Sequence, residues 1–432
     1  MSNPIEKIAF HTLGCKLNFS ESSTISRDFK NQGFSIVKDF ENADIHVINT
    51  CSVTEKADKK AKRIVKKIMQ TSNNPYIAVM GCYAQLQPNQ ISEIDGVNLV
   101  IGDQEKLNAA KHIIKNFHSQ KTKIIHSPIE NSFDFKSSFS MHDRVRSYLK
   151  IQDGCDYPCT YCTIPMARGK SRSDSISNII ENIKILEKNK VSEVILTGVN
   201  IGDYENNGNN KFIDVIENLE NSNSINRIRI SSIEPNLLTH NIIKLIKTSD
   251  SFLPHFHIPL QSGSDKILGL MKRKYNTKIY QSKIQMIRKE IPDACIGADV
   301  IVGFPGETDE DFLITLNFIE NLKIDYLHVF SYSDRLNTVA SVFKYKTPNS
   351  EKIDRSRILQ AISNKKRLKF YKKNLFTTKK VLFENVTDQQ YVTGFSDNYI
   401  RVFTNGDSSM INKVFNVELL EVHDNRIFGK II

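Results

Sequence analysis

Three cysteines lie close together in the segment Gly154-Cys155-Asp156-Tyr157-Pro158-Cys159-Thr160-Tyr161-Cys162, with the spacing C-x-x-x-C-x-x-C. Three thiolates this close can hold three irons of a cubane cluster, whereas structural iron–sulfur and zinc sites normally take four protein ligands. A set of three leaves one metal position open for a ligand that is not protein, as in catalytic metal sites. The spacing therefore predicts a catalytic cluster on Cys155, Cys159 and Cys162. The alternatives are a zinc site that lacks one ligand, or three ordinary thiols.

Three more cysteines each come directly after a strand-like run: Cys15 after Lys7–Thr12, Cys51 after Asp44–Asn49, and Cys82 after Tyr76–Met80. Helical patterns at Ser20–Gln32 and Thr54–Met69 separate these runs, and alternating strands and helices predict a parallel sheet. Because ligands gather at the carboxyl ends of such strands, the three cysteines predict a second three-thiolate site. The alternative is buried cysteine acting as a small hydrophobe. That is how we interpret the seventh cysteine, Cys295, which lies in a predicted core strand.

The middle of the chain alternates regularly between strands and helices. Six strands are expected, at Ser147–Gln152, Glu193–Leu196, Arg227–Ser231, His255–Pro259, Ile296–Val302 and Tyr326–Phe330. Five helices are expected between them, at Ser177–Asn189, Phe212–Leu219, Leu238–Ile246, Tyr280–Lys289 and Asp309–Leu322. Six such units imply an α/β fold with an incomplete barrel, open on one side, whose site lies at the carboxyl ends of its strands.

Turns rich in glycine and small polar residues follow four of these strands, at residues 197–202, 231–235, 261–264 and 303–308. Glycine lets a ligand approach the backbone closely, so we expect a cofactor to bind here. Gly198 and Asn200 lie in the first turn, and Ser232 and Glu234 lie in the second. The Glu234 carboxylate and the serine hydroxyls suit ribose hydroxyls or an ammonium group.

Composition restricts the class of protein and its partners. The 432 residues carry 59 basic and 48 acidic side chains, a net charge of +11 that suggests a polyanionic partner. The first residues do not resemble a signal peptide, and no apolar run is long enough to cross a bilayer, so we expect no membrane contact. Seven cysteines spread over a long chain favour reduced thiols in the cytoplasm over a disulfide framework.

The end of the chain predicts a small β-barrel beside a basic run. Lys365–Lys373 is the basic run, whose alternative interpretation is a solvated helix face. Short strands follow at Lys380–Phe383, Tyr391–Phe395, Tyr399–Phe403, Val414–Val422 and Arg426–Ile432, and predict a small antiparallel barrel. Such barrels commonly bind single-stranded or looped nucleic acid. The expected organisation is an α/β domain at 1–120, a linker at 121–140, the partial barrel at 141–370 and the small barrel at 371–432.

The middle segment resembles the radical S-adenosylmethionine enzymes, whose cluster loop has this cysteine spacing. The whole chain resembles the methylthiotransferases, which join a three-cysteine domain, a radical domain and a TRAM domain. The segments Thr12–Asn18, Asn49–Thr54 and Met166–Ser173 are most similar to the branch that acts on N6-threonylcarbamoyladenosine in tRNA. The isopentenyladenosine branch usually has Arg where Thr54 stands and Gln-Met where Lys16 and Leu17 stand. The branch that acts on a ribosomal-protein aspartate usually has Pro before the Lys that follows its first cysteine.

The resemblance implies two 4Fe-4S clusters, and S-adenosylmethionine as both radical source and methyl donor. The cluster on Cys155, Cys159 and Cys162 would bind S-adenosylmethionine, and one electron would split it into methionine and a 5′-deoxyadenosyl radical. Such a radical can open the unactivated C2–H bond of adenine, which acid–base catalysis cannot. Family similarity places Tyr161 near the cofactor adenine, with Gly198 and the turn from Ser232 to Glu234 around its methionine and ribose. The second cluster, on Cys15, Cys51 and Cys82, would carry the sulfur.

The implied partners are the anticodon stem–loop of tRNA, modified at position 37, a low-potential electron donor and possibly a sulfur donor. Since the threonylcarbamoyl group carries a carboxylate, we expect a fixed cation near the modified base. Arg168 and Arg172 lie just beyond the cluster loop and are the candidates, with phosphate contact as the equal alternative. A protein of another class, an iron–sulfur carrier without its own catalysis, is the remote alternative. The open coordination position argues against it.

Overall fold

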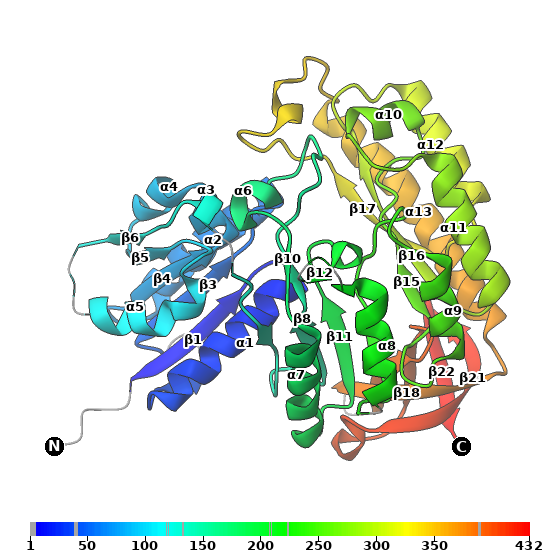
Figure 1. Cartoon of the computed structure of the whole chain (residues 1–432), viewed down its shortest axis with the longest axis horizontal. Helices are drawn as coiled ribbons and strands as arrows, with labels where there is room; N and C mark the ends of the chain where they lie inside the picture. Colours follow the sequence, from blue (N-terminus) through cyan, green and yellow to red (C-terminus); the bar gives the residue numbers. More distant parts are fainter. Residues whose placement is uncertain are drawn as a thin grey trace.

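The computed structural model describes residues 6–38, 42–117, 119, 121–131, 134–206, 208, 210–222, 224–387 and 390–432. Three bodies follow one another along the chain, and Figure 1 shows the N-terminal body beside the central one, with the C-terminal body beneath the latter. None of the described helices is both long and apolar enough to span a membrane.

The N-terminal body is a parallel six-stranded sheet in the order β2-β1-β3-β4-β5-β6. Its strands are β1 (Lys7–Thr12), β2 (Ser35–Val37), β3 (Ile45–Thr50), β4 (Tyr76–Gly81), β5 (Val97–Ile101) and β6 (Lys123–Ile125). Its helices are α1 (Lys16–Asn31), α2 (Glu55–Thr71), α3 (Cys82–Leu86), α4 (Pro88–Ser92) and α5 (Ala109–Asn116). The strand order reverses between β1 and β3, and open α/β sheets bind ligands at the carboxyl ends of strands at such a point.

The central body is a curved sheet of six parallel strands, which confirms the predicted incomplete barrel. The strands are β8 (Arg146–Lys150), β11 (Glu193–Thr197), β14 (Ile228–Ile230), β15 (His255–His257), β16 (Cys295–Val302) and β17 (Tyr326–Ser331). A single bridge between Ser232 and His257 joins the first three strands to the last three. The main helices are α7 (Ile176–Lys188), α8 (Phe212–Ser222), α9 (His240–Thr248), α11 (Thr277–Glu290), α12 (Asp309–Asn321) and α13 (Asn349–Lys373).

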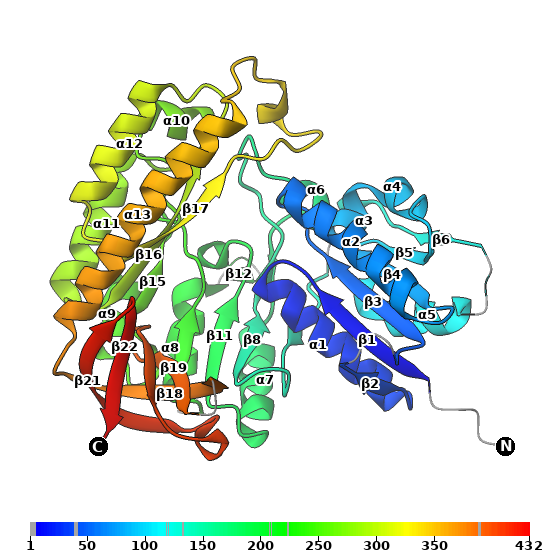
Figure 2. The same ribbon diagram turned by 180° about the vertical axis from the view of Figure 1, so that it is seen from behind.

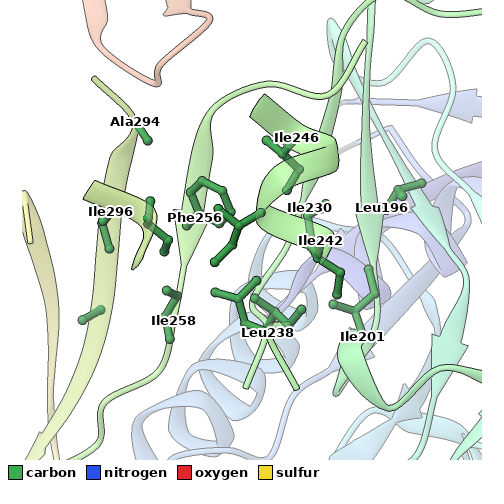
Figure 3. Packing of buried hydrophobic residues seen from close by; sticks show 14 of the residues in the cluster. Leu196, Ile201, Ile230, Leu238, Ile242, Ile246, Phe256, Ile258, Ala294 and Ile296 are labelled. Carbon is green, nitrogen blue, oxygen red and sulfur yellow. The ribbon is translucent and has the colours of Figure 1, made fainter. Parts of the chain in front are cut away.

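Apolar side chains from alternate strand positions pack against the helices and form the main core. Figure 3 shows part of this layer, in which Leu196, Ile230, Phe256 and Ile296 of four strands belong to the same cluster as Ile242 of α9. Because successive side chains of a strand point to opposite faces, the residues between these apolar ones face the lumen of the barrel. The lumen is therefore free to carry polar side chains.

The segment expected as a linker, 121–140, contains strands at both ends. Lys123–Ile125 forms β6 at the edge of the first sheet, and Ser138–Phe139 forms β7, antiparallel to β8. Runs of two or three residues are too short to show a period, which is why the sequence pattern missed them. Ser132 and Phe133 of this segment lie outside the described residues.

The C-terminal body is a closed five-stranded barrel, which confirms the predicted small β-barrel. Its order is β18-β19-β20-β22-β21, with β18 (Thr378–Thr387), β19 (Tyr391–Ser396), β20 (Arg401–Asn405), β21 (Val414–His423) and β22 (Arg426–Ile431). The β20–β22 pairing is parallel, although an antiparallel barrel was expected. An odd number of strands cannot close a ring in which every neighbour is antiparallel.

The small barrel covers the amino ends of the partial barrel strands (Figure 2). Arg229, paired with Glu193 at 2.8 Å, donates to the carbonyl oxygens of Ser396 and Asp397 at 2.6 and 2.9 Å. Arg146 forms an ion pair with Glu384. The carboxyl ends of the strands, where the cysteine loop lies, remain uncovered by this body. The basic run forms the end of α13, and its Phe370 and Tyr371 are buried against the small barrel. Cys295 is buried in the same cluster, which confirms that it is a core residue.

Candidate active site

The first cysteine loop is held in place by its own backbone and by the segment 169–171. Gly154 has φ +70°, and a Cβ there would lie 1.9 Å from the carbonyl oxygen of Lys170, so no other residue fits. The N–H of Cys155 donates to the carbonyl oxygen of Gly169 at 3.1 Å. The side chain of Gln152 donates to the carbonyl oxygen of Gly154 at 2.8 Å, which fixes the loop from below. These contacts position the backbone at the start of the loop, next to Cys155.

Each thiol of this loop accepts one N–H. The backbone N–H of Tyr157 points to Cys155 Sγ at 3.4 Å, that of Ile164 to Cys162 Sγ at 3.5 Å, and Arg273 Nη1 to Cys159 Sγ at 3.1 Å. Hydrogen bonds to sulfur are typical of iron–sulfur sites, where they tune the potential. Burial, reinforced by the neighbouring thiols, raises the pKa of Cys155 to about 11 and that of Cys162 to about 12. Thiolates would therefore form here only with the charge of a metal, which fits a cluster site.

Arg273 is a site residue that the sequence did not single out. Besides Cys159, it contacts the Tyr161 hydroxyl at 3.4 Å and forms an ion pair with Glu234. Burial raises the pKa of Glu234, while Arg273 opposes that shift. Glu234, expected as a cofactor ligand, is thus engaged with Arg273. In the sequence Arg273 stands in the run Lys272-Arg273-Lys274, which gives no sign that one member turns inward.

Buried polar atoms without partners lie at the carboxyl ends of β11 and β14. Both side-chain atoms of Asn200, Oγ of Ser231 and Oδ1 of Asn236 have no hydrogen-bond partner within the described parts of the chain. Buried polar atoms normally have one, so this set fits a polar ligand such as S-adenosylmethionine. Gly198 lies beside Asn200. A Cβ on Gly198 would be 2.8 Å from Oε1 of Gln152, the atom that accepts the backbone N–H of Asn200. Ser232 is the residue that bridges to His257.

The second set of cysteines lies at the carboxyl edge of the first sheet. Cys15 precedes α1, Cys51 follows β3, and Cys82 is the first residue of α3. A Cβ on Gly14 would lie 2.9 Å from Sγ of Cys51, so glycine lets the Cys15 loop approach Cys51. Burial, and then the neighbouring Cys15, raises the pKa of Cys51 to about 11. Burial raises that of Cys82 to about 12, with a smaller effect of Cys51.

One cavity is lined by Cys162 of the first set and by Val53 and Thr54, which follow Cys51 of the second set. Thr163, the residue after Cys162, donates to the carbonyl oxygen of Ser52, the residue after Cys51, at 3.4 Å. A cavity of about 250 Å³ lies beside this contact, and its lining includes Val53, Thr54, Tyr161, Cys162, Asp299, Ile301 and Phe330. Loops that lie more than 100 residues apart in the chain therefore line one cavity.

Arg168 and Arg172, expected as substrate contacts, are engaged with the protein itself. The Arg168 side chain is 1% exposed, and its terminal nitrogens bind Glu21, Asp153 and Asn18 at 2.7 to 3.2 Å. Arg172 donates to the carbonyl oxygens of Arg168 and Lys170 at 2.7 and 3.0 Å. A substrate carboxylate would have to displace buried carboxylates from Arg168, so the structure argues against that role.

Lys16, one residue after Cys15, is the cation that the structure brings toward the lumen. Its side chain is solvent-exposed, and charged groups on three barrel strands act on it: Arg146 of β8, Arg229 of β14 and Asp299 of β16. Withdrawal from bulk water, and then repulsion by Arg146, lower the pKa of Lys16 to about 8, while attraction to Asp299 opposes this shift. The sequence held one signal for it, since the isopentenyladenosine branch usually has Gln at this position.

Known proteins resemble this chain over nearly its whole length. Residues 7–102 match the family described as Uncharacterized protein family UPF0004, and residues 149–319 match the Radical SAM superfamily. The threonylcarbamoyladenosine tRNA methylthiotransferase MtaB of Bacillus subtilis (strain 168) is 34% identical over 96% of this chain and 94% of that protein. A tRNA-2-methylthio-N(6)-dimethylallyladenosine synthase of Endomicrobium trichonymphae is 33% identical over 98% of this chain and 99% of that protein.

A solved structure shares the fold. The radical S-adenosylmethionine methyltransferase TsrM of Kitasatospora setae, with cobalamin and a 4Fe-4S cluster bound, superposes with a TM-score of 0.58. The match covers 78% of this chain and 77% of that one at 13% identity, so it bears on the fold alone. The end-to-end relatives and both family matches give the family: this chain belongs to the radical S-adenosylmethionine methylthiotransferases.

Proposed function

We propose that this chain attaches a methylthio group to C2 of N6-threonylcarbamoyladenosine at position 37 of tRNA, next to the anticodon. The observation that carries the proposal is the contact between the two cysteine loops: Thr163, next to Cys162, donates to Ser52, next to Cys51, beside a cavity lined by Cys162, Val53 and Thr54. Metal sites on two loops in contact could both approach one substrate atom. Cys155, Cys159 and Cys162 would hold one 4Fe-4S cluster, and Cys15, Cys51 and Cys82 a second one.

One S-adenosylmethionine on the first cluster would supply the radical for C–H cleavage, and a second molecule would supply the methyl group in a separate step. The protein supplies position and charge. Asn200, Ser231 and Asn236 offer the unpaired polar atoms that would bind the amino-acid and ribose groups. Arg273 holds both Cys159 and Glu234, and therefore links the cluster loop to this cofactor pocket.

The substrate branch rests on the motifs around the second cysteine set. Curated relatives of both adenosine branches match this chain at 33–34% identity, so identity alone does not separate the two substrates. Thr54 and Lys16, at positions where the isopentenyladenosine branch usually has Arg and Gln, favour threonylcarbamoyladenosine. Lys16 would supply the cation for the threonyl carboxylate. Thr54 lines the cavity.

Helix α2 offers a phosphate-binding face beside the cavity. It begins directly after Thr54, and seven exposed basic residues follow on it: Lys56, Lys59, Lys60, Lys62, Arg63, Lys66 and Lys67. Neutralisation of RNA phosphates by such residues supplies affinity that does not depend on sequence. We propose that α2 contacts the anticodon stem–loop. The C-terminal barrel, docked at the far ends of the strands, remains the second predicted RNA contact.

The test uses purified protein with reconstituted clusters, dithionite in place of the low-potential electron donor, and S-adenosylmethionine. Two tRNAs are compared, one bearing threonylcarbamoyladenosine and one bearing isopentenyladenosine, and nucleosides are analysed by mass spectrometry. We expect methylthiolation of the first substrate and none of the second. Comparable turnover of both would overturn the substrate branch and leave the reaction type intact. A protein that never releases 5′-deoxyadenosine would instead be an iron–sulfur carrier. The sulfur donor and the cytoplasmic location also remain part of this proposal.

A further inference from the structure

A layer of polar side chains crosses the lumen of the partial barrel below the cysteine loops. On β15, β16 and β17, the residues Ile258, Val300 and Val329 pack into the apolar core toward the helices. The alternate positions of the same strands face the lumen, because successive side chains point to opposite faces of a sheet. These positions include His257, Asp299 and His328, which we call the lumen triad.

The lumen triad is a compact set. Asp299 and His328 are register partners on β16 and β17. His257 Nε2 lies 2.9 Å from Asp299 Oδ1, and the His257 and His328 rings stack with centroids 5.3 Å apart. One side-chain N or O atom from each of the three residues lies within 4.8 Å of the other two. Three polar groups thus converge on one point of the lumen.

The layer beneath orients the lumen triad. The Tyr326 hydroxyl lies 3.4 Å from His257 Nδ1 and 2.9 Å from His255 Nε2. It reaches them across β16 because Gly297 has no side chain, since a Cβ there would lie 2.1 Å from Cζ of Tyr326. Tyr399 of the small barrel stacks on His255 at 3.8 Å and closes the floor. The lumen triad therefore has protein beneath it, and one of its ring nitrogens, His257 Nδ1, faces the Tyr326 hydroxyl of that floor.

The layer above the lumen triad is apolar and belongs to the cavity between the cysteine sets. Ile301 and Phe330 are register partners, one step closer to the carboxyl ends of the strands than Asp299 and His328. Asp299 lines the same cavity as Cys162 and Thr54. A flat base can lie against Ile301 and Phe330. Since C2 and N6 of adenine flank N1 on one edge, a base with C2 toward the cysteines can turn its N6 substituent toward Asp299.

We propose that the lumen triad binds the polar substituent on N6 of the substrate adenosine. This inference rests on the proposed function and names the residues that read its substrate. Asp299 would accept a hydrogen bond from a hydroxyl or N–H of the substituent, and His328 would donate to one of its oxygens. An isopentenyl group offers neither, so Asp299 and His328 would gain no hydrogen bond from it. Sites built to hydrogen-bond a substrate group reject analogues that lack it far more strongly than apolar pockets reject a size change.

The experiment measures how much the modification itself adds to tRNA affinity. Two forms of one tRNA, with threonylcarbamoyladenosine or plain adenosine at position 37, are titrated against the holoenzyme and against Asp299→Asn and His328→Leu. We expect the holoenzyme to bind the modified form at least about tenfold more tightly, and both variants to lose that preference while keeping the affinity for plain tRNA. The control is His240→Leu, which removes a histidine on α9 whose side chain is 44% exposed. It should keep the full preference.

Three outcomes would overturn the inference. If the variants retain the preference and the holoenzyme methylthiolates threonylcarbamoyladenosine, the lumen triad is not the reader, while the proposed function stands. If the holoenzyme shows no preference and no activity on that tRNA, both fail. If a divalent metal is bound in addition to the cluster iron and is lost from both variants, the lumen triad is a metal site instead. Unfolding temperature and iron content of each variant, measured in parallel, identify a variant that has merely lost its fold, and Asp299→Glu then replaces it.

Discussion

Arg168 and Glu21 form a paired contact between the partial barrel and the N-terminal sheet domain. Nη1 of Arg168 lies 3.0 Å from one carboxylate oxygen of Glu21, and Nη2 lies 3.2 Å from the other. Both side chains are at most 1% exposed, and Asp153, Lys106 and Lys150 complete the cluster. Burial alone would raise the pKa of Glu21, but Arg168 and the two lysines hold it well below its usual range. This contact helps to fix the position of one cysteine set relative to the other.

Replacing Arg168 by Met should destabilise the protein without changing the salt dependence of tRNA binding. Removing one partner of a buried ion pair leaves uncompensated charge and typically costs about 3–5 kcal/mol. A phosphate contact, by contrast, would reduce the salt dependence when lost. The measurements are urea unfolding and tRNA titrations at several salt concentrations, with Arg168→Lys as the charge-preserving control. An undiminished stability with a reduced salt slope would restore the RNA role.

Replacing Cys155, Cys159 and Cys162 together by Ala should leave roughly half of the iron and abolish 5′-deoxyadenosine formation. The reason is that these thiols form the set of three with an open position, where S-adenosylmethionine would bind. Iron analysis and chromatography of the reaction products give the readout. Cys295→Ala is a matched control, because that thiol is buried among apolar residues. Continued cleavage in the triple variant would end the radical assignment.

Replacing Cys15, Cys51 and Cys82 by Ala should preserve cleavage of S-adenosylmethionine but prevent sulfur attachment. The first cluster loop is held by hydrogen bonds with Gly169 and Gln152, and neither bond involves a cysteine of the second set, so its chemistry should survive. Nucleoside mass spectrometry separates the two readouts. Normal methylthiolation by this variant would show that the second cysteine set carries no sulfur.

Replacing Arg273 by Leu should lower both the reduction potential of the cluster and the rate of cofactor cleavage. The side chain places a positive charge 3.1 Å from Cys159 Sγ, and positive charge near a cluster favours its reduced state. Loss of one charged hydrogen bond, about 1.5–3 kcal/mol, corresponds to about a 10- to 100-fold lower rate. Spectroscopic redox titration measures the reduction potential of the cluster, which would not change if Arg273 had a purely structural role. The reduction potential and cleavage rate of Arg273→Lys should lie between those of the wild type and Arg273→Leu, because lysine keeps the charge but lacks the planar guanidinium.

Acid should destabilise the N-terminal body through His11. Nε2 of His11 lies 3.0 Å from Nδ1 of His46. Burial, and then the charge of His46, lower the pKa of His11 to about 3. Folding thus disfavours the protonated form of His11. Its contribution to stability is complete above pH 6.5, the value of the unfolded chain, and is lost as the pH falls from there toward about 3. His11 alone should cost about 2 kcal/mol between pH 7 and pH 5. Urea unfolding of the wild type and of His11→Gln tests this, and identical pH profiles would contradict it.

Features that depend on residues close together in the chain could be read from the sequence. The spacing of Cys155, Cys159 and Cys162 places three thiols in one loop whatever surrounds it. Strand and helix periods reflect which face of each element is buried, so they located the six barrel strands and the small barrel to within a few residues. The position of Cys15, Cys51 and Cys82 after successive parallel strands placed them at one sheet edge, because parallel strands end at the same side.

Pairings between distant residues were decided only by the tertiary structure. Arg168 looked like a substrate contact in its own segment, yet it meets Glu21, which is 147 positions away. Arg273 likewise lies beside Cys159, which is 114 positions away in the chain. The lumen triad joins three strands whose own patterns show only that one face is polar. A local pattern tells which side of an element avoids water. The partner of a charged group instead depends on how the elements pack, since burial and proximity are properties of the assembled fold.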